Sequence, residues 1–410
     1  MKKVFKYLQN QALEASQQKY SGASYLSPTS KEPQQQTRHH NPSHYKDQHN
    51  SHHQSRSAHP SSAAHSLPAH TATGTSLPTA NGKREMSSQL PDKIFRGITR
   101  HQYAQDNILQ SYELYIPEHD QTHLADAKGN KYWVIYIHGG YFRDPYVSSS
   151  SFYPALGILA SEKDHGHDPK DNGQQFQASD ITPYIAGYAT VNYRLSAHMQ
   201  KAPQDPDTTP TYELRNAKWP EHIYDVLAAI AHLQNKYAFG ERYLLVGHSV
   251  GATMGLLSVL AAEKAPFSTI SGLEMPTIEP PMAILGVSGI YDFPRLHESV
   301  PDYVGLTRNA IHSEADVALA SPAKYTERDY VHTWTGGGKK KRALVIAHSR
   351  DDGWVDWKQP EAMESVLKSQ PAINVRVCEM KGQHNDIWEK GTELARVVVE
   401  AVGVMRGLEA

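Results

Sequence analysis

The stretch Tyr243-Leu244-Leu245-Val246-Gly247-His248-Ser249-Val250-Gly251 decides how this chain is read. A short apolar run followed by G-x-S-x-G is typical of a nucleophile elbow, in which a serine lies on a sharp turn between a strand and a helix. Glycines flank the serine because strand and helix pass too close there for side chains. Ser249 is therefore the candidate nucleophile. The alternative is a chance match, since a pentapeptide with two free positions also arises in unrelated proteins.

A second motif, upstream of the elbow, supports that interpretation. The apolar run 133–137 ends in His138-Gly139-Gly140. Acyl transfer develops negative charge on a carbonyl oxygen, and loops of this kind offer backbone N–H groups to it. We expect an oxyanion hole made by the N–H groups of Gly140, Tyr141 and Val250, with His138 in a structural role. The alternative is a plain Gly-Gly turn after a core strand.

The acid of a serine triad is expected after the nucleophile in the chain, and the histidine after the acid. The apolar run 343–347 leads into a polar loop that contains both Asp351 and Asp352. Residues 348–355 resemble the pattern H-G/S-x-x-D-x-x-V that α/β-hydrolases often show after this strand, and the resemblance implies Asp352 as the acid. Asp351 is read as a solvated carboxylate or a helix cap.

His384 is the expected base among the 24 histidines of the chain. It follows the last apolar run, 373–378, and the turn at Gly382. His248 occupies a variable position of the elbow and His348 marks the end of a strand, and a lone histidine is usually structural. The triad needs no metal and no cofactor, because its side chains supply both nucleophile and base.

The first quarter of the chain differs in composition from the rest. Residues 1–88 are rich in Gln, Ser, His, Pro and Ala, with nine histidines between His39 and His70. Such a segment buries too little apolar surface to offset its ordering entropy, so a disordered tail is expected. Its histidines lack fixed ligand spacing, and its polar start does not fit a secretory signal. Residues 89–410 suit one α/β domain.

Charge and cysteine content exclude several classes of protein. A net charge of −2 without a basic block does not suit nucleic-acid binding, and the run Lys339–Arg342 is read as a solvated loop. Cys378 is the only cysteine and lies in an apolar strand, which excludes a disulfide framework and favours a reducing, cytoplasmic location. No stretch is long and apolar enough for a membrane span. An apolar stripe on the last helix leaves a homodimer open.

Apolar segments alternate with helical patterns, which indicates a mostly parallel sheet covered on both faces. Polar stretches 162–177 and 201–210 are read as surface insertions without a role. The expected strands are 112–117 at an antiparallel edge, 134–137, 188–195, 243–246, 282–287, 343–347 and 373–378, and the expected helices are 221–234, 250 onward and 392–404.

These segments resemble the α/β-hydrolase superfamily, its H-G-G esterases and lipases, and among them the fungal kynurenine formamidases. The run 138–145 reads H-G-G-Y-F-R-D-P where that family shows H-G-G-x-W-R-D-P, so Phe142 replaces a tryptophan. The resemblance implies hydrolysis of N-formyl-L-kynurenine to L-kynurenine and formate, in tryptophan catabolism toward NAD, by the triad Ser249, Asp352 and His384. The aromatic side chains near these elements, Tyr141, Phe142, Trp354 and Trp388, are candidates for the substrate wall.

Two other functions stay open at this point. A general carboxylesterase of the same branch would have an identical triad and a different pocket. A catalytically silent hydrolase-fold binding protein would typically lack a triad member, and here all three candidates are present.

Overall fold

The computed structural model describes residues 90–117, 131–161, 176–261 and 274–410. The expected tail, residues 1–88, and most of the stretch 162–177 lie outside these described residues.

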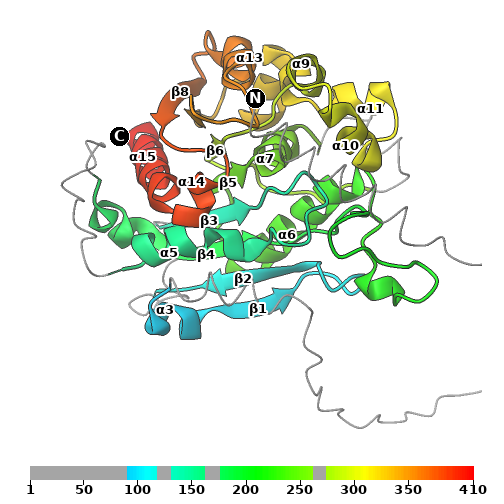
Figure 1. Cartoon of the computed structure of the whole chain (residues 1–410). Coiled ribbons are helices and arrows are strands. Elements are labelled where there is room, and N and C mark those ends of the chain that lie inside the picture. The colour runs from blue at the N-terminus through cyan, green and yellow to red at the C-terminus, as the bar shows by residue number, and fades with distance from the viewer. Residues whose placement is uncertain (1–89, 118–130, 162–175, 262–273) are drawn as a thin grey trace, which may run out of the picture. The chain divides into compact units, whose positions relative to one another are not determined.

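The described chain forms an eight-stranded sheet with the order β1-β2-β4-β3-β5-β6-β7-β8 (Figure 1). Strands β3 to β8 are parallel, whereas β2 pairs antiparallel with both β1 and β4. The α/β-hydrolase fold with a mostly parallel sheet is thus confirmed. The strands are β1 (Thr99–Gln102), β2 (Ser111–Tyr115), β3 (Tyr132–Ile137), β4 (Ile185–Val191), β5 (Tyr243–His248), β6 (Ala283–Val287), β7 (Arg342–Ser349) and β8 (Ile373–Met380).

Two strands differ from the expectation. The segment 112–117 is not the edge, because β1 pairs outside β2. Strand β1 has the sequence T-R-H-Q and is mostly exposed. Because it lacks alternating apolar residues, the sequence pattern did not predict it as a strand. Strand β4 begins before residue 188 and ends at Val191. The chain then leaves the sheet toward helix α6 (Glu221–Tyr237), where Arg194 pairs with Asp225 at 2.8 Å.

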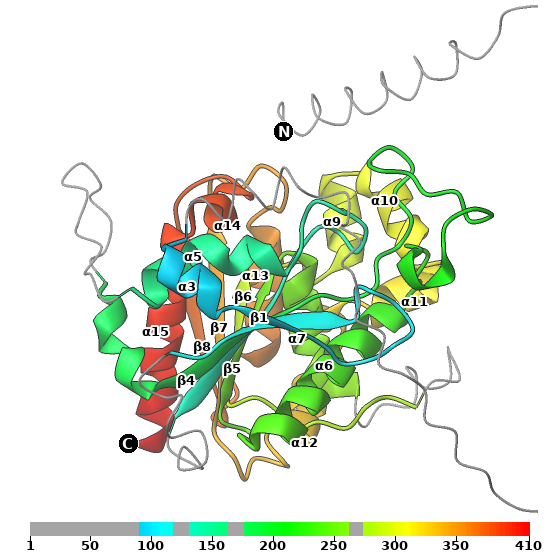
Figure 2. The ribbon, with the colours of Figure 1, turned by 90° about the horizontal axis from the view of Figure 1, so that it is seen from below.

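Side chains of the central strands alternate between two apolar layers, as pleated strands buried on both faces require. In β3, Trp133, Ile135 and Ile137 enter one layer, and Tyr132, Val134 and Tyr136 enter the other. Helices α6 (Glu221–Tyr237), α7 (Val250–Ala261), α12 (Glu327–Trp334) and α13 (Lys358–Leu367) cover the first face, and α3 (Asp92–Gly97), α5 (Tyr153–Leu159), α14 (Asp386–Lys390) and α15 (Thr392–Glu409) cover the second (Figure 2).

The sequence left open whether the apolar stripe of the last helix, α15, faces the protein's own core or a second copy of the chain. This stripe, which includes Leu394, Val398 and Met405, is buried in the second layer. The stripe therefore packs on the molecule's own sheet, and it offers no surface to a second copy.

The run Lys339–Arg342 is not a solvated loop throughout. Arg342 begins β7 and is only 2% exposed, and its guanidinium lies 2.8 Å from the carboxylate of Glu241. A buried arginine is tolerated when it is paired in this way. The prediction was wrong for this residue because its partner is distant in sequence.

Segments beyond the carboxyl ends of the strands build the region around the elbow. After β4 the chain runs through residues 192–220 before it enters α6. After β6, the short helices α9 (Phe293–Ser299), α10 (Tyr303–Ala310) and α11 (Glu314–Leu319) lie near that segment, as Figure 1 and Figure 2 show. In open α/β sheets, ligands bind at this end of the strands.

The elbow joins β5 to α7 through Ser249, whose φ of 56° lies in the left-handed region. A Cβ atom on Gly251 would lie 2.3 Å from the carbonyl oxygen of Ile137, and one on Gly247 would lie 2.3 Å from the backbone of Gly251. Helix α7 therefore crosses the backbone of β3 at a distance that only glycine allows. The strain at Ser249 is of the kind found at functional sites.

Gly251→Ala should lower the free energy of unfolding by about 3 kcal/mol or more, because the added methyl group meets backbone atoms of a central strand that cannot move aside. Gly255→Ala is the matched control in the same helix. Its Cβ atom would lie 3.8 Å from the nearest side chain, and helix propensity favours alanine by about 1 kcal/mol. Urea unfolding curves of both variants test this. Equal midpoints would contradict the close crossing.

Candidate active site

A pocket of about 340 Å³ lies at the carboxyl ends of the strands. The elbow, the loop after β3, helix α10 and the loops after β7 and β8 all contribute to its lining. Ser249 and His384 both line it, although their side chains come from positions 135 residues apart in the sequence. The fold thus brings the expected nucleophile and the expected base to one cavity.

Ser249 occupies the floor of this pocket. It is 4% exposed, and its backbone N–H donates to the carbonyl of Val287 at 2.9 Å, which holds the turn against β6. Among the described residues, Ser249 Oγ makes no hydrogen bond to the ring of His384. Contacts of this type are often long until a substrate is bound.

His384 is held by a carboxylate from the neighbouring loop. Its Nδ1 lies 2.7 Å from Oδ2 of Asp352, and Oδ1 of Asp352 accepts from the N–H groups of Trp354 and Val355 at 2.9 Å each. Burial alone would raise the pKa of Asp352, but the charge and hydrogen bond of His384 outweigh it and hold this pKa well below its usual value. Asp352 is therefore an ionised acceptor that orients the imidazole.

The neighbouring Asp351 lies in a different environment. Its side chain is exposed, and its backbone N–H donates to Oγ of Ser349 at 3.1 Å. The geometry favours Asp352 over Asp351 as the partner of His384. The catalytic role of Asp352 stays a prediction.

Two aromatic rings enclose the imidazole of His384. Trp354 stacks on it with centroids 5.3 Å apart, and the ring of His248 lies 4.7 Å away. His248 Nε2 donates to the carbonyl oxygen of His384 at 3.2 Å. Burial, with a smaller effect of His384, lowers the pKa of His248 to about 3. A neutral His248 therefore holds the His384 backbone without a competing charge, a contact that the motif position did not reveal.

The loop after β3 contains successive residues with left-handed backbone conformation. Gly140 and Tyr141 have φ values of 89° and 50°. Within the described part of the chain, neither of their N–H groups donates to a protein acceptor. Val250 opens α7, and an N–H in the first turn has no partner inside its helix. The three expected donors are thus available to a ligand, and their role stays a prediction.

His138 and Tyr193 hold this loop from behind. The ring of His138 stacks on Tyr193 at 4.3 Å, and the Tyr193 hydroxyl donates to the carbonyl of Gly139 at 2.8 Å. Burial lowers the pKa of His138 to about 4, so the ring is neutral, and its Nδ1 donates to the carbonyl of Gly139 at 2.9 Å. These contacts agree with the structural role expected of His138.

Three of the four aromatic candidates for the substrate wall line the pocket, namely Tyr141, Trp354 and Trp388. Phe142 does not lie in the lining. Its side chain is fully buried among rings of the first apolar layer. The centroid of its ring lies 4.9 Å from that of His222 and 6.3 Å from that of Phe293. The expectation of a substrate contact for Phe142 is therefore corrected, because the turn directs this ring into the core.

One side of the pocket is charged, which the sequence did not indicate. Arg143, Asp144, His198 and Lys201 belong to the lining. Lys201 Nζ lies 2.6 Å from Oδ2 of Asp144, across 57 residues of sequence. The stretch 201–210, expected to be a surface insertion without a role, thus contributes a side chain to the pocket.

In the described residues, no group of three or more His, Cys, Asp or Glu side chains is arranged to hold a metal ion. No helix in the described ranges has the length and apolar character of a membrane span.

Comparisons with known proteins agree with this geometry. The chain is 33% identical over 291 residues to kynurenine formamidase avaC of Aspergillus versicolor, covering 66% of this chain and 87% of that protein. It is 27% identical to the kynurenine formamidase-like hydrolase fscH of Fusarium equiseti, covering 73% and 91%. It is 24% identical to the kynurenine formamidase of Saccharomyces cerevisiae, covering 63% and 84%. No protein-family model matches the chain.

Among solved structures, esterase B of Lactobacillus rhamnosis superposes with a TM-score of 0.51 at 14% identity, covering 80% of this chain and 91% of the esterase. This likeness shows the α/β-hydrolase fold. The identity to avaC over most of its length shows more: the chain belongs to the kynurenine formamidase family.

Proposed function

We propose that this protein is a serine hydrolase that cleaves N-formyl-L-kynurenine to L-kynurenine and formate, a step of tryptophan catabolism toward NAD. The observation that carries the proposal is that Ser249, at a turn with left-handed φ, and His384, which is hydrogen-bonded to Asp352, line the same pocket. Membership of the kynurenine formamidase family supplies the substrate.

In the proposed first step, Ser249 Oγ attacks the formyl carbon while Nε2 of His384 takes the hydroxyl proton. The hydrogen bond from Nδ1 of His384 to Asp352, at 2.7 Å, keeps Nε2 free to accept that proton. The carboxylate also stabilises the imidazolium that results. A serine hydroxyl is a weak nucleophile without such a base.

The negative charge that develops on the formyl oxygen would be taken up by the N–H groups of Gly140, Tyr141 and Val250. Donors that already point at the site need no rearrangement during the reaction, and removal of one such donor typically costs about 100-fold to 1,000-fold in rate. The positive φ values of Gly140 and Tyr141 support this role, since they turn successive N–H groups away from the regular strand.

Collapse of the tetrahedral intermediate completes acylation. The carbon–nitrogen bond breaks as His384 gives its proton to the aniline nitrogen, so L-kynurenine leaves and Ser249 carries a formyl ester. A water molecule then attacks the ester with His384 as base. Formate leaves as His384 returns the proton to Ser249 Oγ, which regenerates the free serine, and no cofactor is consumed.

The formyl group is small, so discrimination must come from the rest of the substrate. Tyr141, Trp354 and Trp388 supply apolar area for its aromatic ring. The Tyr141 ring is held in place by stacking on Tyr303 at 5.1 Å and by a hydrogen bond to Thr307 at 2.8 Å. A pocket of about 340 Å³ falls in the usual size range for small-molecule sites.

We also propose a reducing compartment such as the cytoplasm. Cys378 is the only cysteine in the sequence and is buried. Burial, with the nearby charge of Glu400, raises the pKa of its thiol to about 12, which leaves it unreactive.

The first test is release of L-kynurenine from N-formyl-L-kynurenine by purified protein, followed by liquid chromatography. Ser249→Ala should lower kcat by about 10,000-fold or more, as loss of a triad serine does. A short-chain nitrophenyl ester serves as the competing substrate. Ester cleavage without deformylation would instead indicate a general carboxylesterase, and absence of both activities, with no labelling of Ser249 by a fluorophosphonate, would indicate a silent binding protein.

Asp352→Asn should lower kcat by about 10,000-fold, because the amide favours the wrong imidazole tautomer while the fold is kept. Asp351→Asn is the matched control, since that side chain is exposed in the same loop, and it should retain wild-type kcat. Steady-state kinetics with circular dichroism of both variants measures this. The opposite pattern would move the role of the acid to Asp351.

A further inference from the structure

The lining of the pocket contains both apolar and charged side chains. Trp354 stacks on the imidazole of His384, and Ile290, Leu306 and Val355 also belong to the lining. Arg143, Asp144, His198 and Lys201 form what we call the charged side of the pocket. The deformylation chemistry proposed above uses none of these four side chains. The reaction does not require these charges. Charged side chains in a small cavity are suited to binding a charged group of the ligand.

Asp144 places this charged side next to the expected oxyanion loop. A Cβ atom on Gly140 would lie 3.2 Å from Cβ of Asp144, so the two residues are in contact. Oδ1 of Asp144 accepts from the N–H of Tyr146 at 3.0 Å, which holds the carboxylate in one orientation. Oδ2 receives Nζ of Lys201 at 2.6 Å.

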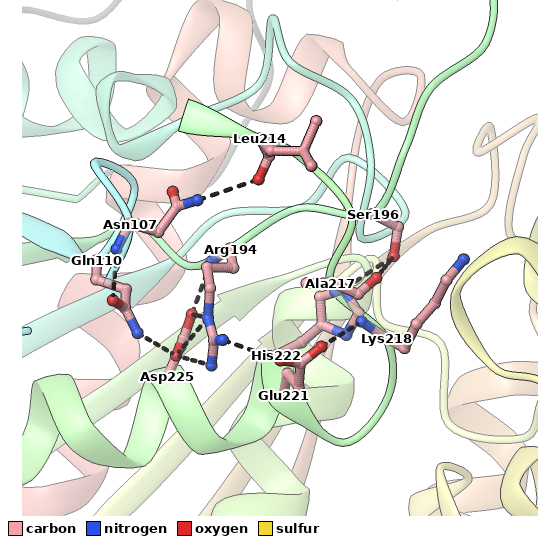
Figure 3. Close-up of polar contacts among 10 residues, drawn as sticks. All are labelled: Asn107, Gln110, Arg194, Ser196, Leu214, Ala217, Lys218, Glu221, His222 and Asp225. Atoms are coloured by element: carbon pink, nitrogen blue, oxygen red, sulfur yellow. Dashed lines mark hydrogen bonds and ion pairs between the residues drawn. The ribbon is translucent and has the colours of Figure 1, made fainter. Parts of the chain in front are cut away.

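The segment that carries Lys201 is anchored rather than loose (Figure 3). At its start, Arg194 pairs with the fully buried Asp225 at 2.8 Å and with Glu221 at 2.9 Å. Ser196 Oγ then donates to the carbonyl of Ala217 at 2.7 Å, so both arms of the loop 197–216 are held together. The two ends of the loop, between β4 and helix α6, are therefore fixed next to the start of α6.

His198 fixes the turn that presents Lys201. Its Nδ1 accepts from the backbone N–H groups of Gln200 and Lys201 at 3.3 and 3.0 Å. Burial and the nearby charge of Arg143 lower the pKa of His198 to about 4, so this ring is neutral. The charges on this side of the pocket are thus those of Arg143 and Lys201 against that of Asp144.

The Lys201–Asp144 pair remains accessible to a ligand. A quarter of the Lys201 side chain and 19% of that of Asp144 are exposed. A zwitterion can lie beside such an ion pair with its negative group next to the lysine and its positive group next to the aspartate. Each of the four charges then has two neighbours of opposite sign, and no charge is left desolvated and unpaired.

We propose that this charged side binds the α-amino-acid group of the substrate, with Lys201 taking the α-carboxylate and Asp144 taking the α-ammonium. The inference rests on the proposed function and assigns the residues that recognise the amino-acid end of its substrate. Arg143 adds a second positive charge to the lining, which favours the carboxylate end. Lys201 and Asp144 act as recognition residues and take no part in proton transfer.

Three substrates separate the contributions of the two residues. N-formyl-L-kynurenine carries both charged groups, N-formylkynurenamine lacks the carboxylate, and 2-formamidoacetophenone lacks both while keeping the ring, the ketone and the formyl group. Lys201→Met should lower kcat/KM for N-formyl-L-kynurenine by about 10-fold to 100-fold, the usual effect of losing a charged hydrogen bond, and should leave the other two substrates within about threefold. Asp144→Asn should lower kcat/KM for both amines and spare 2-formamidoacetophenone.

Lys340→Met is the matched control. Lys340 also forms an ion pair, 2.6 Å from Glu241, but lies before β7 at the amino ends of the strands. The Lys340→Met substitution should leave kcat/KM unchanged for all three substrates. Equal losses on the three substrates for Lys201→Met would overturn the inference and assign the ion pair a structural role as a latch between the two loops.

Binding gives a readout that does not depend on turnover. In Ser249→Ala protein, calorimetry with N-formyl-L-kynurenine should show a Kd that Lys201→Met weakens at least 10-fold. If the wild-type protein cleaves none of the formamides, the proposed function fails, and this binding experiment still decides the recognition site. Binding that is absent or insensitive to Lys201 would overturn it.

Discussion

The close crossing of helix α7 over strand β3 is the constraint on which the site depends. With glycine at position 251, the helix passes the carbonyl of Ile137 at a distance that excludes any Cβ atom. This crossing brings the first turn of α7, which begins at Val250, close to the end of β3 and the H-G-G loop. Ser249, directly before that turn, has a left-handed φ of 56°. The predicted nucleophile and its predicted oxyanion donors thus lie next to one packing contact.

Among the titratable side chains around Ser249, burial keeps the histidines His138 and His248 neutral, whereas pairing keeps the carboxylate of Asp352 charged. His138 and His248 are buried and kept neutral, with pKa values lowered to about 4 and about 3, so they support backbone without adding charge. Asp352 is the buried carboxylate that stays ionised, because His384 pairs with it. The single charge beneath the imidazole is therefore placed where a developing imidazolium needs it. In our proposal, the charged side formed with Lys201 recognises the substrate and takes no part in this arrangement.

Much of the fold could be predicted because its parallel strands are buried on both faces and appear as continuous apolar runs. Strand β1 was not predicted, because its polar residues pair at an exposed edge of the sheet, where alternating apolar residues are not required. In the site, the elbow and the H-G-G loop were found from local motifs whose glycines reflect backbone geometry. Phe142 was misplaced because a motif position does not say to which side a turn directs its ring. Lys201 was missed because nothing near it in sequence indicates a pocket.

By itself, the sequence determined the local features of this protein: the strand-to-helix elbow at Ser249, the glycines that permit it, and the chain order of serine, acid and base. These features are encoded in short segments, since they depend on backbone conformation and on apolar period. Only the tertiary structure placed Asp352, and not Asp351, against His384, and only it brought Lys201 to Asp144. Both are contacts between side chains far apart in the chain, and their partners are set by how the loops beyond the sheet pack, which no local pattern contains.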